Sequence, residues 1–350
     1  MATNEQNRNA GGAGGNWRVL SMMDTSVCPD ALDGLARAVE LVGAAPDQQR
    51  LEEMIGGFDA FLAALNVRVT ADVLERAPRL RVIATPTTGL DHIDVAAAEA
   101  RGVAILSLKN DVAWLESVTA TAELTWGLLL AVVRHLPEAV AASRAGDWAR
   151  DRFRGNQLSG KTLGIVGYGR LGRMVAEYGR AFRMPVLVCD VKPVRTTPGV
   201  TQTTFEEVLR RSDVVSVHIH LTPKNRHLFD ASAIRSMKPG AILLNTSRRL
   251  IIDESAMLAA LEVGHLGGVG LDVIDGEWDP ALQNHPLIQY SNRRDNLIIT
   301  PHIGGVTFES QSSSFVQTVR KLRDFVSHSS LPGSGFSSIT NTHEYTEQQR

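Results

Sequence analysis

Residues 162–172 read Thr162-Leu163-Gly164-Ile165-Val166-Gly167-Tyr168-Gly169-Arg170-Leu171-Gly172. An apolar run of strand length leads into three glycines spaced Gly-x-Gly-x-x-Gly, and a helical pattern follows them. In that pattern apolar residues recur at intervals of three and four, at Leu171, Val175, Tyr178 and Phe182. A strand, a glycine-rich turn and a helix in this order predict the start of a parallel α/β unit.

Each glycine of this loop has a predicted role. Gly167 allows the tight turn, Gly169 lets a phosphate approach the backbone, and Gly172 lets the helix pack closely on the strand. The free N–H groups at the start of the helix would meet the phosphates of a dinucleotide. The alternative is a glycine turn that binds no ligand.

Asp190 closes the next apolar run, 18 positions after Gly172. A carboxylate at this place accepts hydrogen bonds from the hydroxyls of the adenosine ribose and repels a 2′-phosphate. The sequence therefore predicts NAD as the cofactor in preference to NADP, although Lys192 and Arg195 lie nearby. If the loop bound nothing, Asp190 would serve only as a cap.

Short apolar runs alternate with helical patterns on both sides of the loop. Before it, strands are predicted at 18–22, 60–65, 80–84 and 104–107, with helices at 71–76 and 95–101. From the loop onward, strands are predicted at 162–166, 186–189, 214–218, 241–245, 268–273 and 297–300. Such alternation is typical of parallel sheets covered by helices on both faces.

Two long helical stretches connect these runs. Residues 116–144 form one, in which Pro137 is expected to kink or split the helix, and residues 307–328 form the other. A chain of 350 residues is long enough for two cores. Because the last helix can return to the first core, we predict that the first domain is discontinuous and that the second is inserted into it.

The overall composition favours a small-molecule partner. With 36 basic and 38 acidic residues the net charge of -2 gives no attraction to nucleic acid or to a membrane surface. Cys28 and Cys189 stand far apart, which indicates neither a disulfide framework nor a zinc site. We see no apolar run near the roughly 20 residues of a membrane span and no signal peptide, and therefore predict a cytoplasmic protein.

Three polar residues follow predicted strands of the second domain. Arg248 follows the run 241–245, Glu277 follows 268–273, and His302 follows 297–300. Ligands of parallel α/β sheets bind at the carboxyl ends of the strands. These residues are therefore candidates for an anion-binding fork, a carboxylate and an acid/base.

With these residues the sequence resembles the D-isomer-specific 2-hydroxyacid dehydrogenase family, most closely its phosphoglycerate-dehydrogenase-like members, over residues 18–327. The motifs that carry the resemblance are Thr88-Gly89-Leu90-Asp91-His92-Ile93-Asp94, Thr121-Ala122-Glu123, Gly160-Lys161-Thr162-Leu163-Gly164-Ile165-Val166-Gly167, Leu271-Asp272-Val273 and Pro301-His302-Ile303-Gly304-Gly305. The resemblance implies an NAD-dependent oxidoreductase that interconverts a D-2-hydroxy acid and its 2-keto acid, of the phosphoglycerate dehydrogenase or hydroxypyruvate/glyoxylate reductase type.

The resemblance also implies roles for individual residues. Arg248, Glu277 and His302 correspond to the catalytic residues. Implied cofactor contacts are Gly167, Gly169, Arg170, Leu171, Gly172, Asp190, His218, Thr222, Thr246, Ser247, Asp272, His302 and Gly304. Implied substrate contacts are Thr87, Thr88 and Gly89 together with Arg248.

The chemistry of the implied reaction suits these residue types. Histidine, with an unperturbed pKa of about 6.5, can take or give the hydroxyl proton. A carboxylate from Glu277 would orient the His302 ring and favour its protonated form. The planar, always charged fork of Arg248 would hold the substrate carboxylate and polarise the carbonyl oxygen.

Several alternatives stay open. Arg249 could exchange roles with Arg248, and Glu277 could be a solvated loop residue, since Trp278 stands where the family usually has proline. His218 and His220 face one side, as two metal ligands would, but no third ligand is apparent and we predict no metal. The family usually has proline at the position of His220 as well.

The domains and partners follow from the same resemblance. We predict a disordered N-terminus at 1–15, a substrate-binding catalytic domain at 16–113 and 308–330, an NAD-binding Rossmann domain at 114–307 and a mobile tail at 331–350. The fold class is α/β, with two Rossmann-like or flavodoxin-like domains. The family implies a homodimer. The alternative function is an NAD(H)-sensing interaction protein that resembles the C-terminal-binding corepressors.

Overall fold

The computed structural model describes residues 17–329, which form two compact units. Of the described residues, unit 1 contains 17–115 and 308–329, and unit 2 contains 116–307. The first boundary was predicted between residues 113 and 114. The disorder predicted for 1–15 and the mobile tail predicted for 331–350 lie outside the described residues.

Unit 1 is built on a parallel sheet in the order β2-β1-β3-β4-β5. Its strands are β1 Arg18–Ser21, β2 Glu40–Gly43, β3 Ala60–Leu62, β4 Val82–Ala84 and β5 Ala104–Leu106. Its helices are α1 Asp33–Ala36, α2 Gln48–Met54, α3 Ala71–Glu75, α4 Val95–Ala100, α5 Val112–Leu115 and α13 Phe308–Ser329, with short 3-10 turns at Pro29–Leu32 and Ile55–Gly57. This strand order is that of the flavodoxin-like folds.

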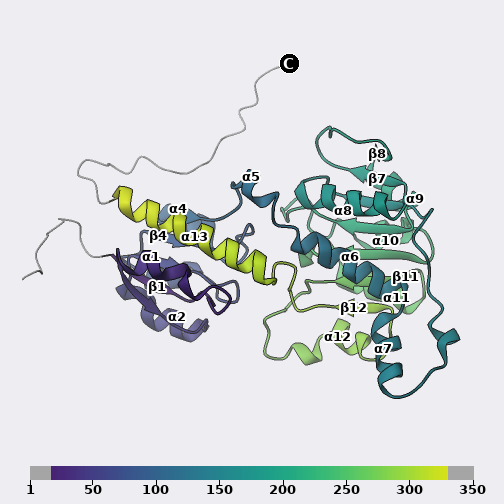
Figure 1. The fold of residues 1–350 in the computed structure, drawn as a ribbon, viewed down its shortest axis with the longest axis horizontal. Helices are drawn as coiled ribbons and strands as arrows, with labels where there is room; N and C mark the ends of the chain where they lie inside the picture. The colour runs from purple at the N-terminus through teal and green to yellow at the C-terminus, as the bar shows by residue number, and fades with distance from the viewer. Residues whose placement is uncertain (1–16, 330–350) are drawn as a thin grey trace, which may run out of the picture. The chain divides into compact units, whose positions relative to one another are not determined.

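Alternate residues of the unit 1 strands point to two separate cores. Leu20 packs in one cluster with α2 and α3 side chains, whereas Val19 packs in the other with Leu322 of α13. Helix α13, yellow in Figure 1, thus belongs to unit 1 although it follows unit 2 in the chain. The predicted discontinuous fold is confirmed by this return.

Unit 2 contains a larger parallel sheet in the order β12-β11-β10-β9-β6-β7-β8. Its strands are β6 Leu163–Val166, β7 Val186–Cys189, β8 Val200–Gln202, β9 Val214–Val217, β10 Ala241–Asn245, β11 Leu266–Leu271 and β12 Leu297–Ile299. Its helices are α6 Ala120–Val133, α7 Leu136–Arg144, α8 Arg170–Ala181, α9 Phe205–Arg211, α10 Ala231–Ser236, α11 Glu254–Glu262 and α12 Pro286–Ser291, with 3-10 turns at Arg150–Phe153, Arg249–Ile251 and Leu282–Asn284. This is the Rossmann order, and the winding direction reverses between β6 and β9.

The predicted helical stretch 116–144 is split into two helices, as we expected from Pro137. Helix α6 ends at Val133 and α7 begins at Leu136, with Pro137 in its first turn. His135 between them has a left-handed backbone with φ of 51°. One detail of the periodic pattern is wrong: Phe182 caps the end of α8, is 39% exposed, and packs on Trp126 at 5.0 Å between ring centroids.

The expectation that no segment resembles a membrane span needs correction. Among the described residues, 112–133 is long and apolar enough by length and composition, with a mean hydropathy of 1.2. In unit 2, however, α6 buries Ala122, Trp126 and Leu129 in the same core as the β6 side chains. Its apolar composition is therefore that of a core helix.

Candidate active site

The glycine loop after β6 leaves room for a phosphate. Gly167 has φ of +93°, and a Cβ there would lie 2.5 Å from the carbonyl oxygen of His218, so only glycine fits. A Cβ on Gly172 would lie 2.0 Å from the carbonyl oxygen of Gly167, which is how closely helix α8 approaches the loop. Gly169, at the N-cap of α8, faces open space. The residues present therefore fit the pyrophosphate of a dinucleotide.

Asp190 holds the loop from the end of β7. Its Oδ2 accepts a hydrogen bond from the N–H of Tyr168 at 2.8 Å, and its Oδ1 accepts one from the N–H of Lys192 at 3.1 Å. A carboxylate has lone pairs beyond these two, so ribose hydroxyls can still bind to it. The sequence predicted the ribose contact but not the bracing of the loop.

The neighbouring loop residues are partly engaged within the chain. The Arg170 guanidinium donates to the carbonyl oxygen of Val118, and burial lowers its pKa. The side chain of Leu171 packs against the core of unit 2. A cofactor contact from Leu171 would therefore come from its backbone.

His302 and Glu277 form a close pair. The Nδ1 atom of His302 lies 3.1 Å from both carboxylate oxygens of Glu277, and the two side chains are 23% and 18% exposed. Because an ionised carboxylate only accepts hydrogen bonds, Nδ1 must carry a proton and donate it. Nε2 is then left to exchange a proton with a ligand.

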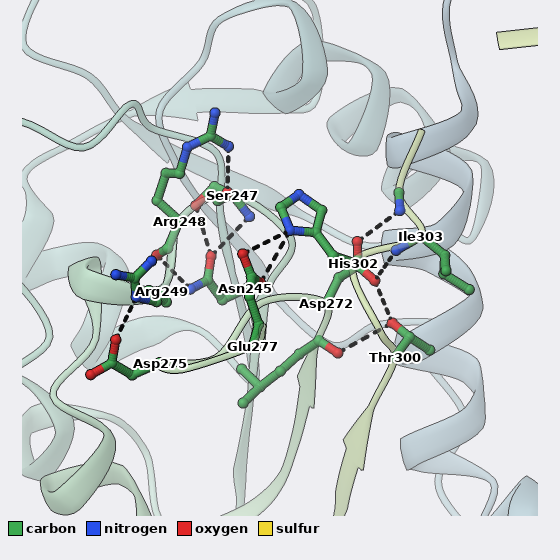
Figure 2. Close-up of polar contacts among 12 residues, drawn as sticks. Asn245, Ser247, Arg248, Arg249, Asp272, Asp275, Glu277, Thr300, His302 and Ile303 are labelled. Carbon is green, nitrogen blue, oxygen red and sulfur yellow. Dashed lines mark hydrogen bonds and ion pairs between the residues drawn. The ribbon is translucent and has the colours of Figure 1, made fainter. Parts of the chain in front are cut away.

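The turn that carries His302 is strained and tightly held. His302 has a left-handed backbone with φ of 55°, which is unfavourable for a residue other than glycine. The buried Asp272 accepts hydrogen bonds from the N–H groups of Ile303 at 2.8 Å and Gly304 at 2.7 Å and from the hydroxyl of Thr300 at 2.6 Å (Figure 2). Burial raises the pKa of the Asp272 carboxyl, although these hydrogen bonds oppose the rise. Asp272 thereby fixes the direction of the His302 side chain.

Arg248 and Arg249 point to different partners. The Nη1 of Arg248 donates to the carbonyl oxygen of Ser247 at 2.8 Å, and the side chain of Asn245 braces this turn by donating to the carbonyl oxygen of Arg248 at 2.9 Å. The Nε of Arg249 instead donates to Asp275 at 2.6 Å (Figure 2). Because Arg249 is tied to a carboxylate, Arg248 is the better candidate for a substrate fork.

The remaining predicted cofactor residues of unit 2 lie at strand ends. The hydroxyl of the buried Thr246 lies 2.7 Å from that of Thr125, and Ser247 donates its hydroxyl to Asn245. The ring of His218 bonds to the hydroxyl of Ser216 at 2.8 Å, and burial lowers the pKa of His218 to about 4. Thr222 is exposed in the loop after β9.

Metal binding finds no support in this region. His218 has a hydrogen-bonded ring, and His220 lies on the exposed loop after β9. Residues 17–329 contain no group of three or more His, Cys, Asp or Glu side chains that could hold a metal ion.

The predicted substrate residues of unit 1 form a polar turn after β4. Thr87 donates its hydroxyl to the carbonyl oxygen of Gly89 at 2.7 Å and lies 3.0 Å from the hydroxyl of Thr85. The Thr85 hydroxyl also lies 3.2 Å from Nε2 of the buried His92. The backbone around Thr88 is therefore held in one shape by side chains of its own unit.

Some residues of the site were missed in the sequence. Asn245 closes β10, Thr300 follows β12 and Asp275 follows β11, so the rule that polar residues at strand ends are site candidates would have found them. The position of Trp278 could not be predicted in this way. Its ring is nearly parallel to that of His302, with 6.4 Å between centroids and an interplanar angle of 23°, and the residue is 51% exposed.

This arrangement can combine the binding of an anion with proton transfer. A phosphate-binding loop, a cation and an oriented histidine lie at the carboxyl ends of strands in one unit. Arg248 can hold an anion and stabilise charge on an oxygen, while His302 can exchange a proton with that oxygen.

The chain is similar to known proteins of one enzyme family. The family model described as "D-isomer specific 2-hydroxyacid dehydrogenase, NAD binding domain" matches residues 126–304. The chain is similar to the D-3-phosphoglycerate dehydrogenase of Methanocaldococcus jannaschii, with 37% identity over 271 residues that cover 76% of this chain and 49% of the relative. It is also similar to the glyoxylate reductase of Thermofilum pendens, with 35% identity over 285 residues that cover 79% of this chain and 81% of the relative.

A solved structure shows the same architecture. It is the D-lactate dehydrogenase of Aquifex aeolicus complexed with NAD and lactic acid, which superposes with a TM-score of 0.78 at 27% identity and covers 89% of this chain and 97% of that one. The chain spans about half the length of the phosphoglycerate dehydrogenases that it matches, 49% and 50% in two of them.

Proposed function

The chain belongs to the D-isomer-specific 2-hydroxyacid dehydrogenase family, and on this premise we propose that it interconverts a D-2-hydroxy acid and the corresponding 2-keto acid. Its cofactor is NAD. The observation that carries the proposal is the pair formed by His302 and Glu277, 3.1 Å apart, in the unit that also contains the glycine loop.

His302 is proposed as the acid/base. In the oxidative direction its Nε2 takes the proton of the substrate hydroxyl, while the C2–H bond breaks and its electron pair leaves as hydride. NAD held at the glycine loop by Gly167, Gly169 and Asp190 would supply the hydride acceptor, and NADH the hydride donor in the reductive direction. Glu277 keeps Nδ1 protonated, so Nε2 is the free nitrogen in the neutral ring, and it stabilises the imidazolium once the proton has arrived.

Arg248 is proposed as the substrate fork. A guanidinium binds a carboxylate through two parallel hydrogen bonds and remains charged throughout the reaction. In the reductive direction it also stabilises the negative charge that develops on the carbonyl oxygen. Because Asn245 braces the backbone of Arg248, little freedom has to be lost when the substrate binds.

Further contacts are proposed for the cofactor and the substrate. In the pyrophosphate loop the proposal assigns Gly167, Gly169, Arg170, Leu171 and Gly172, with Asp190 on the ribose. At the other strand ends it assigns His218, Thr222, Thr246, Ser247, Asp272 and Gly304. Thr87, Thr88 and Gly89 of unit 1 are proposed to bind the substrate carboxylate through their backbone.

The test is a panel of 2-keto acids assayed for oxidation of NADH. Glyoxylate, hydroxypyruvate, pyruvate and phosphohydroxypyruvate represent the chemistry of the relatives, and we expect turnover with at least one of them. Tight NADH binding without turnover of any acid would overturn the enzymatic function and favour an NAD(H)-sensing interaction protein.

We also propose that the protein is a homodimer. Leu136 and Val140 on α7 are each 44% exposed, and Trp148 in the following loop is 81% exposed, which makes an apolar surface on unit 2. Light scattering should give twice the chain mass of 38.0 kDa. The double substitution Val140→Asp with Trp148→Ser should shift the protein to monomers, and an unchanged mass would exclude this surface.

A cytoplasmic location is proposed from the chemistry of the cysteines. Cys28 and Cys189 are both free thiols, and burial raises the pKa of Cys189 to about 12, so it stays unreactive. Cell fractionation checks the location, and recovery outside the cytoplasmic fraction would contradict it.

A further inference from the structure

The loop that carries Glu277 is anchored two residues before it. The N–H of Asp275 donates to Oε1 of Glu254 at 2.7 Å, and the carboxylate of Asp275 accepts from Nε of Arg249 at 2.6 Å. We call Arg249, Glu254 and Asp275 the Asp275 anchor. It joins the loop of Glu277 to the loop that follows β10, where Arg248 lies.

Glu254 is the stronger half of this anchor. Its side chain is 18% exposed, whereas that of Asp275 is 60% exposed, so solvent weakens the ion pair between Asp275 and Arg249. Burial raises the pKa of Glu254, although the N–H of Asp275 opposes the rise. A charge-assisted hydrogen bond from a backbone N–H to a mostly buried carboxylate is the polar contact that holds the loop after the buried side chain of Ile274.

His285 holds Glu254 in turn. Its Nδ1 accepts the N–H of Leu287 at 3.2 Å at the start of α12, so its proton must be on Nε2. That nitrogen lies 3.4 Å from Oε2 of Glu254. Both oxygens of Glu254 are thus engaged and the carboxylate cannot rotate freely.

The residue between the anchor and Glu277 explains why an anchor is needed. Gly276 has a left-handed backbone with φ of +64° and no side chain to restrict it. The N–H of Asp279 donates to the carbonyl oxygen of Gly276 at 2.7 Å and closes the turn that carries Glu277. Without a fixed point at Asp275, this turn would be free to move as a whole and carry Glu277 away from the ring of His302. A displaced carboxylate would no longer favour the protonated ring.

We propose that Arg249, Glu254 and Asp275 are positioning residues which hold Glu277 against His302 and so set the pH range of proton transfer. This inference rests on the proposed function. The proposed function assigns none of these three residues to the cofactor or the substrate, and the anchor acts only through Glu277.

The test compares two anchor variants with a matched control. Glu254→Ala should lower kcat/KM for keto-acid reduction about 10-fold and move the alkaline limb of its pH profile down by about one pH unit, because the imidazolium loses its partner. Asp275→Ala, which loses the exposed ion pair and the hydrogen bond that its carboxylate accepts from the N–H of Gly276, should change both quantities in the same direction by a few-fold. Asp279→Ala, two residues after Glu277 in the same loop, should change neither.

The same substitutions in a protein that lacks the Glu277 carboxylate distinguish a positioning role from a general loss of structure. In a Glu277→Gln protein, the added Glu254→Ala or Asp275→Ala should have no further effect on kcat/KM or on the pH profile. Additive losses in that background, or anchor variants whose pH profiles coincide with that of Asp279→Ala, would overturn the proposal. If Glu254→Ala does not fold, Asp275→Ala carries the same test, since its side chain is exposed.

A readout without substrate distinguishes the two proposals. The ring of His302 is titrated by NMR in the full chain, with its signal assigned by its loss in His302→Asn. Asp272, the other carboxylate that interacts with the ring, is unchanged in every anchor variant. A midpoint that falls in Glu254→Ala but not in Asp279→Ala supports the anchor even if no keto acid is turned over, and equal midpoints contradict it even if the enzyme is active.

Discussion

Units 1 and 2 are both parallel sheets covered by helices, but they differ in the residues at the carboxyl ends of their strands. In unit 2 the strands end in the glycine loop, Asp190, Arg248 and the pair of Glu277 and His302. In unit 1 the residues predicted to bind substrate after β4 are Thr87, Thr88 and Gly89, in a turn braced by Thr85 and His92. The same folding physics therefore gives two sheets, and the chemistry depends on which side chains stand at the strand ends.

The two units also differ in how their candidate residues lie relative to the point where the strand order reverses. In unit 2 it lies between β6 and β9, where Gly167 and His218 approach each other. In unit 1 it lies between β1 and β3, but the residues predicted to bind substrate follow β4. The residues proposed to bind the cofactor in unit 2 thus lie at the site that its fold offers for a ligand, whereas the prediction for unit 1 depends on family resemblance alone.

The largest expected effect is the loss of the acid/base from unit 2. His302→Asn should lower turnover by about 100-fold or more, because the proposed general acid/base is removed, while NADH binding stays within a few-fold. Asparagine tolerates the left-handed backbone that His302 adopts. Steady-state kinetics and a fluorescence titration of NADH measure the two quantities.

His227→Asn is the matched control, since His227 also has a positive φ, of 52°, in the same unit. Equal losses in both variants would mean that turnover reports backbone integrity and not catalysis. The proposal that catalytic side chains stand at the strand ends of unit 2 would then lose its support.

The second effect compares Arg248 of unit 2, proposed to bind the substrate carboxylate, with Arg79 of unit 1, which is paired with Asp59. Arg248→Lys should lower kcat/KM about 10- to 100-fold, since one point charge cannot replace two parallel hydrogen bonds. In unit 1, Nη2 of Arg79 donates to both oxygens of Asp59, at 3.1 and 3.2 Å, and Arg79→Lys should leave kcat/KM unchanged. If the variant of Arg79 were the more damaging one, substrate recognition would have to be reassigned to unit 1.

The third effect concerns two aspartates that both accept a backbone N–H. Asp190→Asn keeps an oxygen for the N–H of Tyr168 but removes the charge that repels a 2′-phosphate. The ratio of kcat/KM for NADPH over NADH should rise about 10-fold. Asp59→Asn in unit 1, where the carboxylate accepts the N–H of Arg18 at 2.9 Å, should leave this ratio unaltered. A ratio that does not move in Asp190→Asn would place the ribose contact elsewhere.

The smallest effect is a difference in acid stability between the units. The pKa of His218 is about 4 in the folded protein and about 6.5 when unfolded, so the unfolded state binds more protons between these values. The stabilisation from the neutral ring is complete above pH 6.5 and is lost as the pH falls toward 4. The free energy of unfolding of unit 2 should therefore decrease by at most about 1.4 kcal/mol per pH unit in this window.

Hydrogen exchange of backbone amides at pH 7 and pH 5 measures the local stability of the two units separately. Amides of β6 and β9 should lose more protection on acidification than amides of β1 and β3, and His218→Asn should remove that excess. If the amides of β6 and β9 lose the same protection in His218→Asn, groups other than His218 cause the acid sensitivity of unit 2.

The sequence predicted the strands that form continuous apolar runs and missed two strands that do not. The bounds of β7 and β10 agree with the predicted runs 186–189 and 241–245, because their residues are almost all buried and form continuous apolar stretches. β2 and β8 were missed. β2 is partly exposed throughout and β8 buries only Val200, and both contain polar residues or glycine. The edge strands β5 and β12 were predicted because all their residues are apolar.

The candidate site was predicted as separate residues and not as an arrangement. Arg248, Glu277 and His302 were chosen because each follows a strand, which is a local property. The structure brings Glu277 and His302, 25 positions apart, to 3.1 Å and gives Arg249 a carboxylate partner. Asp272, predicted as a cofactor contact, also braces the turn of His302 with three hydrogen bonds.

The sequence by itself determined the alternation of strands and helices, the glycine spacing of the phosphate loop and the polar residues that close the strands. These depend on periodicity and on backbone freedom, which are local. Only the tertiary structure decided which arginine is tied to Asp275, which nitrogen of His302 faces Glu277 and what anchors the loop of Glu277. Those outcomes depend on the register between β10, β11 and β12, which brings side chains from distant parts of the chain to one edge of the sheet.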